Sequence, residues 1–332
     1  MKKMIVIFAV LTALIACDND SSKNGNLPKP VSIGKTGEIL TIINNPEWDS
    51  EIGDTIRSVF KKPYPMLPQS EQSFNLLQLA NSSFVQVMKK HRSILLISLS
   101  DEFKSTKLTV SRDLWAAPQI VINALGSDVH SIANLIASRR DTIFKLFEQS
   151  ELALQSALAV QYSDRKNFDS VKKKFNVDLH IPTDYYLMRN DRDFMWFESQ
   201  TTKSSMGIFV YTSPISADTV LSLNSLISRR DSILREKVHG ARDSSWMTTT
   251  DFILPEFEIK IDDNGLQYGE LRGLWELVND YMGGPFVSRS YIDRKRNRII
   301  TVEGYVYAAG DKKRDRIRKI TGILNTLKKQ EE

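Results

Sequence analysis

The sequence predicts an α+β protein built from antiparallel sheets with helices on one face, arranged as tandem ferredoxin-like units with an internal duplication. Three observations lead to this prediction. Three stretches of the chain share the order strand, strand, helix; two of these stretches are related in sequence; and a hairpin is clearly marked near residue 265. Hairpins pair strands antiparallel, and helices that return across the same sheet cover one of its faces.

The first elements follow from local patterns. Residues 37–43 (GEILTII) are apolar and rich in β-branched side chains, which predicts a strand. Pro46 then opens a helix that runs to about Phe60, with apolar residues recurring on one helical face. Residues 62–69 (KPYPMLPQ) are rich in Pro and predict a loop. Apolar residues at near-helical spacing follow between Phe74 and Met88.

The three strand–strand–helix stretches come next, and each predicted helix begins at an Asp. An Asp at this position accepts hydrogen bonds from free backbone N–H groups and favours the positive end of the helix. The first stretch has strands at 94–99 and 119–125 and a helix from Asp128. The second has strands at 194–198 and 208–212 and a helix from Asp218. The third has strands at 286–292 and 299–308 and a helix from Asp311 to about Lys328.

The first two stretches match each other at a constant offset of 90 residues. Residues 138–141 and 228–231 are both SRRD, and Asp128 corresponds to Asp218. We infer an internal duplication, with convergence of two ordinary amphipathic helices as the alternative. The paired Arg residues are interpreted as surface residues whose stems cover apolar groups.

A hairpin and a further helix complete the predicted elements. Over residues 256–267, apolar and charged side chains alternate, and Asn264 with Gly265 fits a tight turn. Residues 271–281 (LRGLWELVNDY) are predicted to be helical. We expect two α+β domains, at residues 33–178 and 179–332.

The N-terminus predicts export and lipidation. Two lysines precede an apolar run at residues 4–14, too short to span a bilayer but typical of a signal peptide. The run ends in LIAC, which resembles the lipobox of bacterial lipoproteins, and Cys17 is the only cysteine in the chain. Residues 1–16 are therefore predicted to be a signal peptide, Cys17 the lipidated residue, and residues 17–32 a flexible tether.

These features predict a protein held in the cell envelope, on the outer membrane, by its N-terminal acyl chains. Asp18 and Asp20 resemble export signals of surface lipoproteins, inner-membrane retention signals or simple solvating residues, so the leaflet stays open. Loss of Lys2 and Lys3 with the signal peptide lowers the formal net charge from +5 to +3. That small excess, together with an envelope location, argues against nucleic acid as a partner.

The sequence shows no recognisable catalytic, metal or cofactor site. A phosphate loop ending at residues 34–36 (GKT) would need a glycine where Lys29 stands, and no HExxH or GxSxG motif is present. The four histidines have no partner spacing typical of a site, and one cysteine excludes a Cys-rich zinc site. We therefore predict no catalytic residue, no metal and no cofactor.

The third predicted hairpin offers the best candidate binding surface. Alternation along its second strand puts Ile300 and Val302 on a core face and Tyr305 on the opposite face. Tyrosine rings beside charged groups suit a sugar ring or a peptide. The alternative is that this second face is solvated or covered by another layer. The candidate binding residues are Arg289, Tyr291, Glu303, Tyr305 and Tyr307.

Six short segments together resemble an uncharacterised family of Bacteroidota envelope lipoproteins, known only as a domain of unknown function. They are residues 34–38 (GKTGE), 67–69 (LPQ), 91–92 (HR), 272–276 (RGLWE), 283–286 (GGPF) and 303–305 (EGY). The resemblance brings no activity. We expect a non-catalytic binding or accessory module whose partner is an envelope protein, a glycan or a peptide. The alternative is a lipid-anchored hydrolase with an unrecognised active site.

Overall fold

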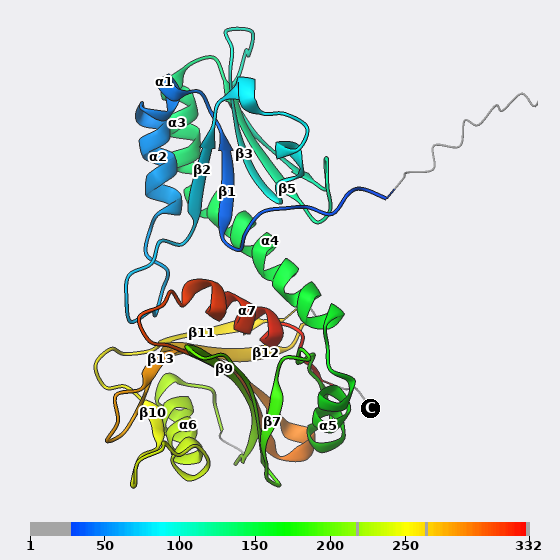
Figure 1. Ribbon diagram of the computed structural model, residues 1–332, viewed down its shortest axis with the longest axis vertical. Coiled ribbons are helices and arrows are strands. Elements are labelled where there is room, and N and C mark those ends of the chain that lie inside the picture. The colour runs from blue at the N-terminus through cyan, green and yellow to red at the C-terminus, as the bar shows by residue number, and fades with distance from the viewer. Residues whose placement is uncertain (1–27, 217–218, 263–264, 330–332) are drawn as a thin grey trace, which may run out of the picture.

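The computed structural model describes residues 28–216, 219–262 and 265–329 and folds them into two units connected by a long helix (Figure 1). The predicted signal peptide, Cys17 and most of the predicted tether lie outside the described residues, as do Asp218 and Asn264. The architecture is a mixture of helices and sheets, as predicted.

The first unit contains a five-stranded sheet in the order β2-β1-β3-β5-β4. Its strands are β1 (Glu38–Ile42), β2 (Asn75–Leu79), β3 (Ser93–Leu99), β4 (Lys107–Arg112) and β5 (Ile120–Gly126). Only β4 runs antiparallel to its neighbour, so the expectation of an antiparallel sheet is wrong for this unit. Its central strands are near-continuous apolar runs, which is typical of parallel strands buried on both faces.

Helices cover one face of this sheet, on the left in Figure 1: α1 (Asn45–Trp48), α2 (Glu51–Phe60) and α3 (Val129–Ser138). The Asp128 carboxylate accepts a hydrogen bond from the backbone N–H of Ser131 at 2.8 Å, which confirms the predicted cap of α3. Residues 74–88, whose apolar residues have near-helical spacing, contain β2 and the short 3-10 turn η1 (Asn81–Ser83), and the turn η2 (Met88–Lys90) ends the segment.

The helix α4 (Arg140–Gln161) links the two units. At 1.5 Å per residue its 22 residues span about 33 Å. Near its start, Ile143 and Phe147 are buried in the core of the first unit. Near its end, Ala159 belongs to the core of the second unit, and the helix packs against α7 (Arg314–Leu324).

The second unit is built on an eight-stranded antiparallel sheet in the order β10-β12-β13-β14-β9-β8-β7, with β11 also paired to β12. The strands are β7 (Tyr186–Asn190), β8 (Phe194–Gln200), β9 (Ser204–Pro214), β10 (Met247–Thr249), β11 (Glu256–Ile261), β12 (Gln267–Leu277), β13 (Gly283–Asp293) and β14 (Arg298–Ala308), and the short turn η3 (Arg294–Arg296) joins β13 to β14.

The pairing of β11 with β12 confirms the predicted hairpin, with Ile261 opposite Gln267. The helix predicted at residues 271–281 is wrong, because residues 271–277 belong to β12 and residues 278–281 form the turn after it. Leu271, Trp275 and Leu277 enter one core cluster at even spacing, which is the period of a strand and not of a helix.

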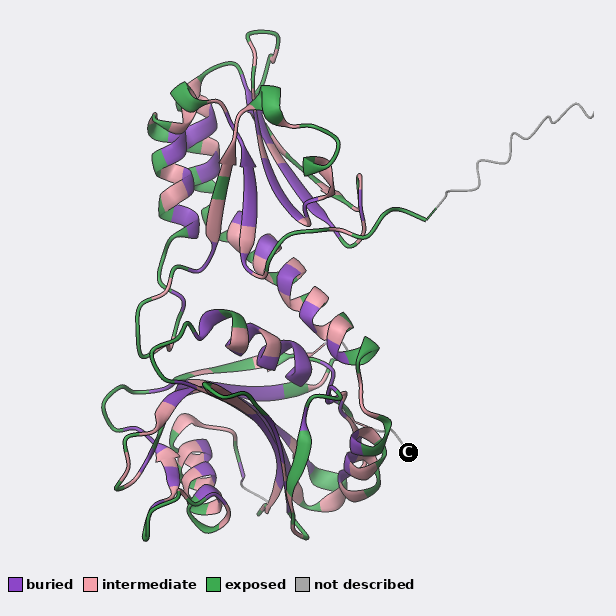
Figure 2. Cartoon of the chain, viewed as in Figure 1, coloured by how far each residue is buried: buried purple, intermediate pink, exposed green. Residues whose placement is uncertain are grey.

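Both faces of this sheet are covered. On one face lie α7 and α5 (Arg165–Phe175), and on the other lies α6 (Leu223–Lys237), as Figure 1 shows. Figure 2 accordingly shows the central strands as buried. The short strands β6 (Val177–Asp178) and β15 (Lys328–Lys329) pair antiparallel and form a separate two-stranded sheet in this unit. Val171 and Phe175 pack in the second core, so residues 164–178 lie with the second unit and not with the first, where the predicted domain boundary put them.

The predicted tandem duplication is not confirmed. In the first stretch β3 and β5 are parallel, whereas in the second β8 and β9 are antiparallel. Helix α6 begins after Ser222, whose side chain caps it, and not at Asp218. The two SRRD segments also differ in burial, because Arg140 is exposed and its counterpart Arg230 is fully buried.

Candidate functional site

The predicted binding face on β14 lies inside the protein. Tyr305 is only 3% exposed and Glu303 is completely buried. The ring of Tyr305 stacks on Phe209 at 5.1 Å between ring centres, and its hydroxyl donates to Glu198 at 2.7 Å. Tyr307 packs partly buried against the same core. The expectation of an exposed tyrosine platform is therefore wrong, because α6 and the strand β10 cover this face.

The buried charge of Glu303 is matched by Arg230 on α6. The guanidinium Nε donates to the two carboxylate oxygens at 3.0 and 3.1 Å, and Nη2 lies 2.8 Å from Oε1. The hydroxyl of Tyr211 donates to the same carboxylate, and burial raises the pKa of Tyr211 well above its usual value. The guanidinium also lies 3.8 Å from the ring centre of Phe286. This cluster therefore stabilises the interior and has no exposed face for a ligand.

Arg289 and Tyr291 face the opposite side of the sheet from Tyr305. On the paired strands Arg289 lies opposite Val302, and Tyr291 opposite Ile300, so these two side chains share the core face of β14. Directly opposed residues in antiparallel strands point to the same side. The structure thus separates the five candidate residues into two groups that do not meet.

Arg289 and Tyr291 line a cavity of about 600 Å³, which we call the α4–sheet pocket. It lies between the second half of α4 and the ends of β11, β12 and β13, with the residues after α7 closing one side. Ala153 and Ser156 come from α4, Tyr268 from β12 and Asn325 from the end of α7. Clefts between structural units are a common location of ligand sites.

The aromatic and charged groups of this pocket are held in a fixed arrangement. Tyr268 and Tyr291 stack with ring centres 5.1 Å apart, and the guanidinium of Arg289 lies 5.1 Å from the ring of Tyr268. Arg289 donates to Glu270 at 3.0 Å. Glu270 also accepts from Lys260 at 2.7 Å and from Arg272 at 2.8 Å.

Electrostatics keep Glu270 ionised. Its burial alone would raise the pKa, but Arg272, Arg289 and Lys260 together hold the pKa of Glu270 well below its usual range. Burial also raises the pKa values of Tyr268 and Tyr291, so both phenols stay neutral donors at neutral pH. Glu270 therefore stays a carboxylate, and Arg289, Arg272 and Lys260 share its single negative charge.

Sequence reasoning missed Tyr268 and Glu270 because the segment that follows them was predicted to be a helix. Read as a strand, β12 places Glu270 directly opposite Arg289, a cross-strand pair of opposite charges. The contribution of α4 had no such local signal, since Ala153 and Tyr291 are far apart in the chain.

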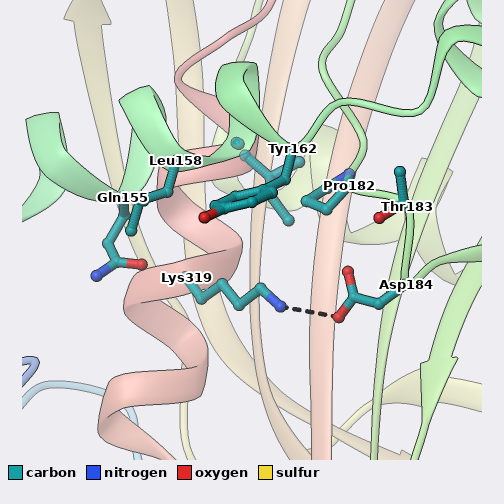
Figure 3. Close-up of a pocket in the computed structure, with 9 residues that line it drawn as sticks. Gln155, Leu158, Tyr162, Pro182, Thr183, Asp184 and Lys319 are labelled. Carbon is teal, nitrogen blue, oxygen red and sulfur yellow. Dashed lines mark hydrogen bonds and ion pairs between the residues drawn. The ribbon is translucent and has the colours of Figure 1, made fainter.

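A second, smaller cavity of about 380 Å³ lies on another side of α4, bounded by α7 and the loop at residues 182–184 (Figure 3). Lys319 of α7 reaches Asp184 at 3.0 Å, and the ring of Tyr162 lies beside Pro182. Its charged groups pair with each other, and its remaining walls are mainly apolar. It offers a ligand fewer polar groups than the α4–sheet pocket.

The described residues show no arrangement typical of a metal centre. No group of three or more His, Cys, Asp or Glu side chains within residues 28–216, 219–262 and 265–329 could hold a metal ion. In the same part of the chain, no helix combines the length and the apolar character needed to cross a membrane. The α4–sheet pocket instead presents stacked rings, hydroxyls, amides and charges of both signs, which suit binding.

Two family models match the chain, both of unknown function. Residues 32–159 match the model described as Domain of unknown function (DUF8532), and residues 164–326 match Domain of unknown function (DUF4837). The matches support the predicted resemblance to uncharacterised proteins, and they meet at the end of α4. No curated protein matches the chain.

A solved structure similar to part of the chain is the Ran-binding protein Mog1p of Saccharomyces cerevisiae. The two share 6% sequence identity over 46% of this chain and 89% of Mog1p, with a TM-score of 0.31. A likeness at this level adds nothing to the description of the α4–sheet pocket.

Proposed function

We propose that the chain is a lipid-anchored protein of the cell envelope that acts as a non-catalytic binding module, with the α4–sheet pocket as its ligand site. One observation carries the proposal: the pocket brings Tyr268, Tyr291 and Arg289 together with polar groups from α4 in a single cavity. Tyrosines supply large contact area at a low cost in conformational entropy, which is why they are frequent in binding sites. The predicted acylation of Cys17 supplies the envelope location.

The chemistry of the pocket favours a glycan or peptide segment of an envelope component. Arg289, Lys328 and Asp262 bring both signs of charge to the lining of the pocket. Arg289 is also engaged by Glu270, so we expect polar groups, and not one strong charge, to decide which ligand binds. The rings of Tyr268 and Tyr291 are 6% and 2% exposed and form part of the cavity wall. The hydroxyl and amide groups of the lining can bond to the polar atoms of a sugar or a peptide.

We expect Ala153→Trp to abolish ligand binding by filling the pocket from the side of α4. Ala153 is exposed and lines the cavity, so a larger side chain removes no buried packing. The measurement is the shift in unfolding temperature caused by soluble envelope oligosaccharides and short peptides, since a ligand present at 100 times its Kd stabilises by about 2.7 kcal/mol.

The matched control is Ala137→Trp, at an exposed alanine of α3 that does not line the pocket. It should bind like the unmodified chain. A ligand that raises the unfolding temperature of the Ala153→Trp protein as much as that of the unmodified protein binds elsewhere and contradicts the proposed site.

The location is tested separately. We expect Cys17→Ser to remove acyl labelling and to move the protein out of the membrane fraction, because the substituted side chain cannot form the thioether to the lipid. Each buried CH₂ of an acyl chain contributes about 0.8 kcal/mol, so loss of two or three chains is decisive. Membrane fractionation that is unchanged by the substitution, with acyl labelling intact, would end the anchoring proposal.

A further inference from the structure

One face of the first unit's sheet is covered by loops and not by helices. Helices α2 and α3 lie on one side of the sheet, while the segment that begins at residue 28 approaches on the other side (Figure 1). On this second side a small core around Leu40, Ile94 and Val121 is closed by Phe84 and Trp115. We call the surface formed by residues 28–35, 84–90 and 112–118 the loop face.

The three segments of the loop face are bonded into one surface. The N–H of Ile33 donates to the carbonyl of Lys90 at 2.9 Å, and the N–H of Ala117 donates to the carbonyl of Pro30 at 2.9 Å. The side chain of Gln119 donates to the carbonyl of Lys89 at 2.6 Å and so connects the second and third segments. These contacts hold the loop face as a fixed platform.

Apolar side chains on the loop face point into solvent. Val31 is 79% exposed, Val85 54% and Val87 52%, and Ile33, Met88 and Leu114 are also exposed. Single exposed apolar residues are ordinary, but six on bonded neighbouring segments form a patch of the kind that marks contact with a protein or a membrane.

The same surface is cationic. The three segments contribute Lys29, Lys35, Lys89 and Lys90, against a single acidic residue, Asp113. Arg112 is not counted, because its strand partner Ile120 belongs to the helix-covered core. The ammonium of Lys89 lies 5.7 Å from the ring centre of Trp115 and 5.9 Å from that of Phe84. A lysine stem that lies over apolar surface with its charge at the edge is suited to an anionic interface.

The chain enters the structure at this surface. The described residues begin at residue 28, inside the loop face, and Cys17 precedes it by eleven residues. At about 3.3–3.6 Å per residue, an extended segment of that length reaches at most about 40 Å. The loop face is therefore the part of the described chain nearest in sequence to the predicted acyl anchor.

We propose that the loop face lies against the anionic phospholipid surface of the membrane, with its apolar side chains at headgroup level and its lysines on lipid phosphates. This inference rests on the proposed anchoring at Cys17. It orients the first unit toward the bilayer and leaves the second unit, with the α4–sheet pocket, further from it.

The experiment uses the absence of other cysteines. In the lipidated protein Cys17 carries no free thiol, so Leu114→Cys introduces a single site for an environment-sensitive fluorophore. The labelled protein is reconstituted in vesicles of phosphatidylethanolamine and phosphatidylglycerol. We expect blue-shifted emission and about twofold quenching by nitroxides placed near the headgroups, since surfaces of this kind enter roughly 5–10 Å into the headgroup region. Ser58→Cys, exposed on α2 at the opposite face, should show neither effect.

A second comparison tests the patch itself. Val85→Asp combined with Val87→Asp should abolish quenching at position 114, whereas Val110→Asp should not. Val110 is an exposed valine (43%) whose strand partner Ile122 belongs to the helix-covered core, so it lies on the other side of the sheet.

The outcomes separate the two proposals. A protein that labels at two thiols and stays out of the vesicles lacks the anchor, and the proposed function fails. A vesicle-bound protein with one labelled thiol and no quenching at position 114 keeps its anchor but overturns the proposed orientation. A blue shift without quenching by lipid-borne nitroxides would place protein, not lipid, on the loop face and would also overturn it.

Discussion

Glu303→Ala is expected to lower the free energy of unfolding by about 3–5 kcal/mol, because it leaves the guanidinium of Arg230 buried without its counter-charge. Both groups are buried, and Glu303 contacts Arg230 through both carboxylate oxygens. The measurement is urea unfolding, in which the midpoint should fall while the slope stays constant, as expected for a loss of stability without a change in the unfolded state.

A double substitution separates the net contribution of the Arg230–Glu303 pair to stability from the destabilisation caused by removing only one partner. Arg230→Met with Glu303→Leu replaces both charges by apolar groups of similar size, and such replacements are often neutral or stabilising. We therefore expect the double variant to recover most of the stability that Glu303→Ala loses. A double variant as unstable as the single one would mean that packing around the site, and not the unpaired charge, dominates.

The sequence supplies its own control. Arg140 occupies the position that matches Arg230 at the 90-residue offset, but it is exposed. Arg140→Ala should change stability by no more than about 0.5 kcal/mol, the usual range for surface substitutions. Arg230→Ala, which leaves Glu303 buried without its counter-charge, should instead cost about 3–5 kcal/mol. The matching arginines of the two SRRD segments would then differ in their contribution to stability.

This contrast shows why the site could be predicted only in part. The alternation of Thr301, Glu303 and Tyr305 along β14 is the pattern of a half-solvated strand, and it correctly separates the two faces of the strand. It does not distinguish a solvated polar face from a buried one whose charges are paired. The pairing partner, Arg230, lies on a helix 73 residues earlier, so local periodicity contains no information about it.

The errors in the fold have a similar origin. The apolar runs of β3 and β5 were recognised as strands, but their direction depends on which strands they neighbour, and β4 returns antiparallel between them in sequence. Residues 271–277 fit a strand period once Gly273 is counted with Leu271 and Trp275 on one face. The strong helix propensity of its three leucines and of Glu276 favours a helix, and tertiary pairing overrides it.

The connection between the two units gives the second large expected effect. Arg318 of α7 is fully buried, donates to the carbonyl of Ser73 at 2.7 Å and to Glu148 at 2.6 Å, and lies 4.5 Å from the ring centre of Phe74. Glu71 accepts hydrogen bonds from the backbone N–H groups of Lys313 and Arg314 at the start of the same helix. Arg318, a side chain of the second unit, is thus hydrogen-bonded to the loop at Ser73 in the first unit and to the helix α4.

We expect Arg318→Ala to lower the free energy of unfolding by about 3 kcal/mol or more, since hydrogen bonds to charged groups contribute about 1.5–3 kcal/mol each. The two units should then unfold in separate thermal transitions, because the contact that couples them is weakened. Arg316→Ala, a partly exposed arginine on the same helix, is the control and should leave the unfolding curve nearly unchanged.

The same substitution should weaken ligand binding in the α4–sheet pocket, whose walls come from α4 and from strands of the second unit. Arg318 does not line that pocket, so a loss of affinity would reflect the relative placement of the walls. If Arg318→Ala unfolds in one transition and binds ligand normally, α4 alone fixes the two units, and its packing against α7 through residues such as Ala159 and Ile323 becomes the contact that holds the pocket open.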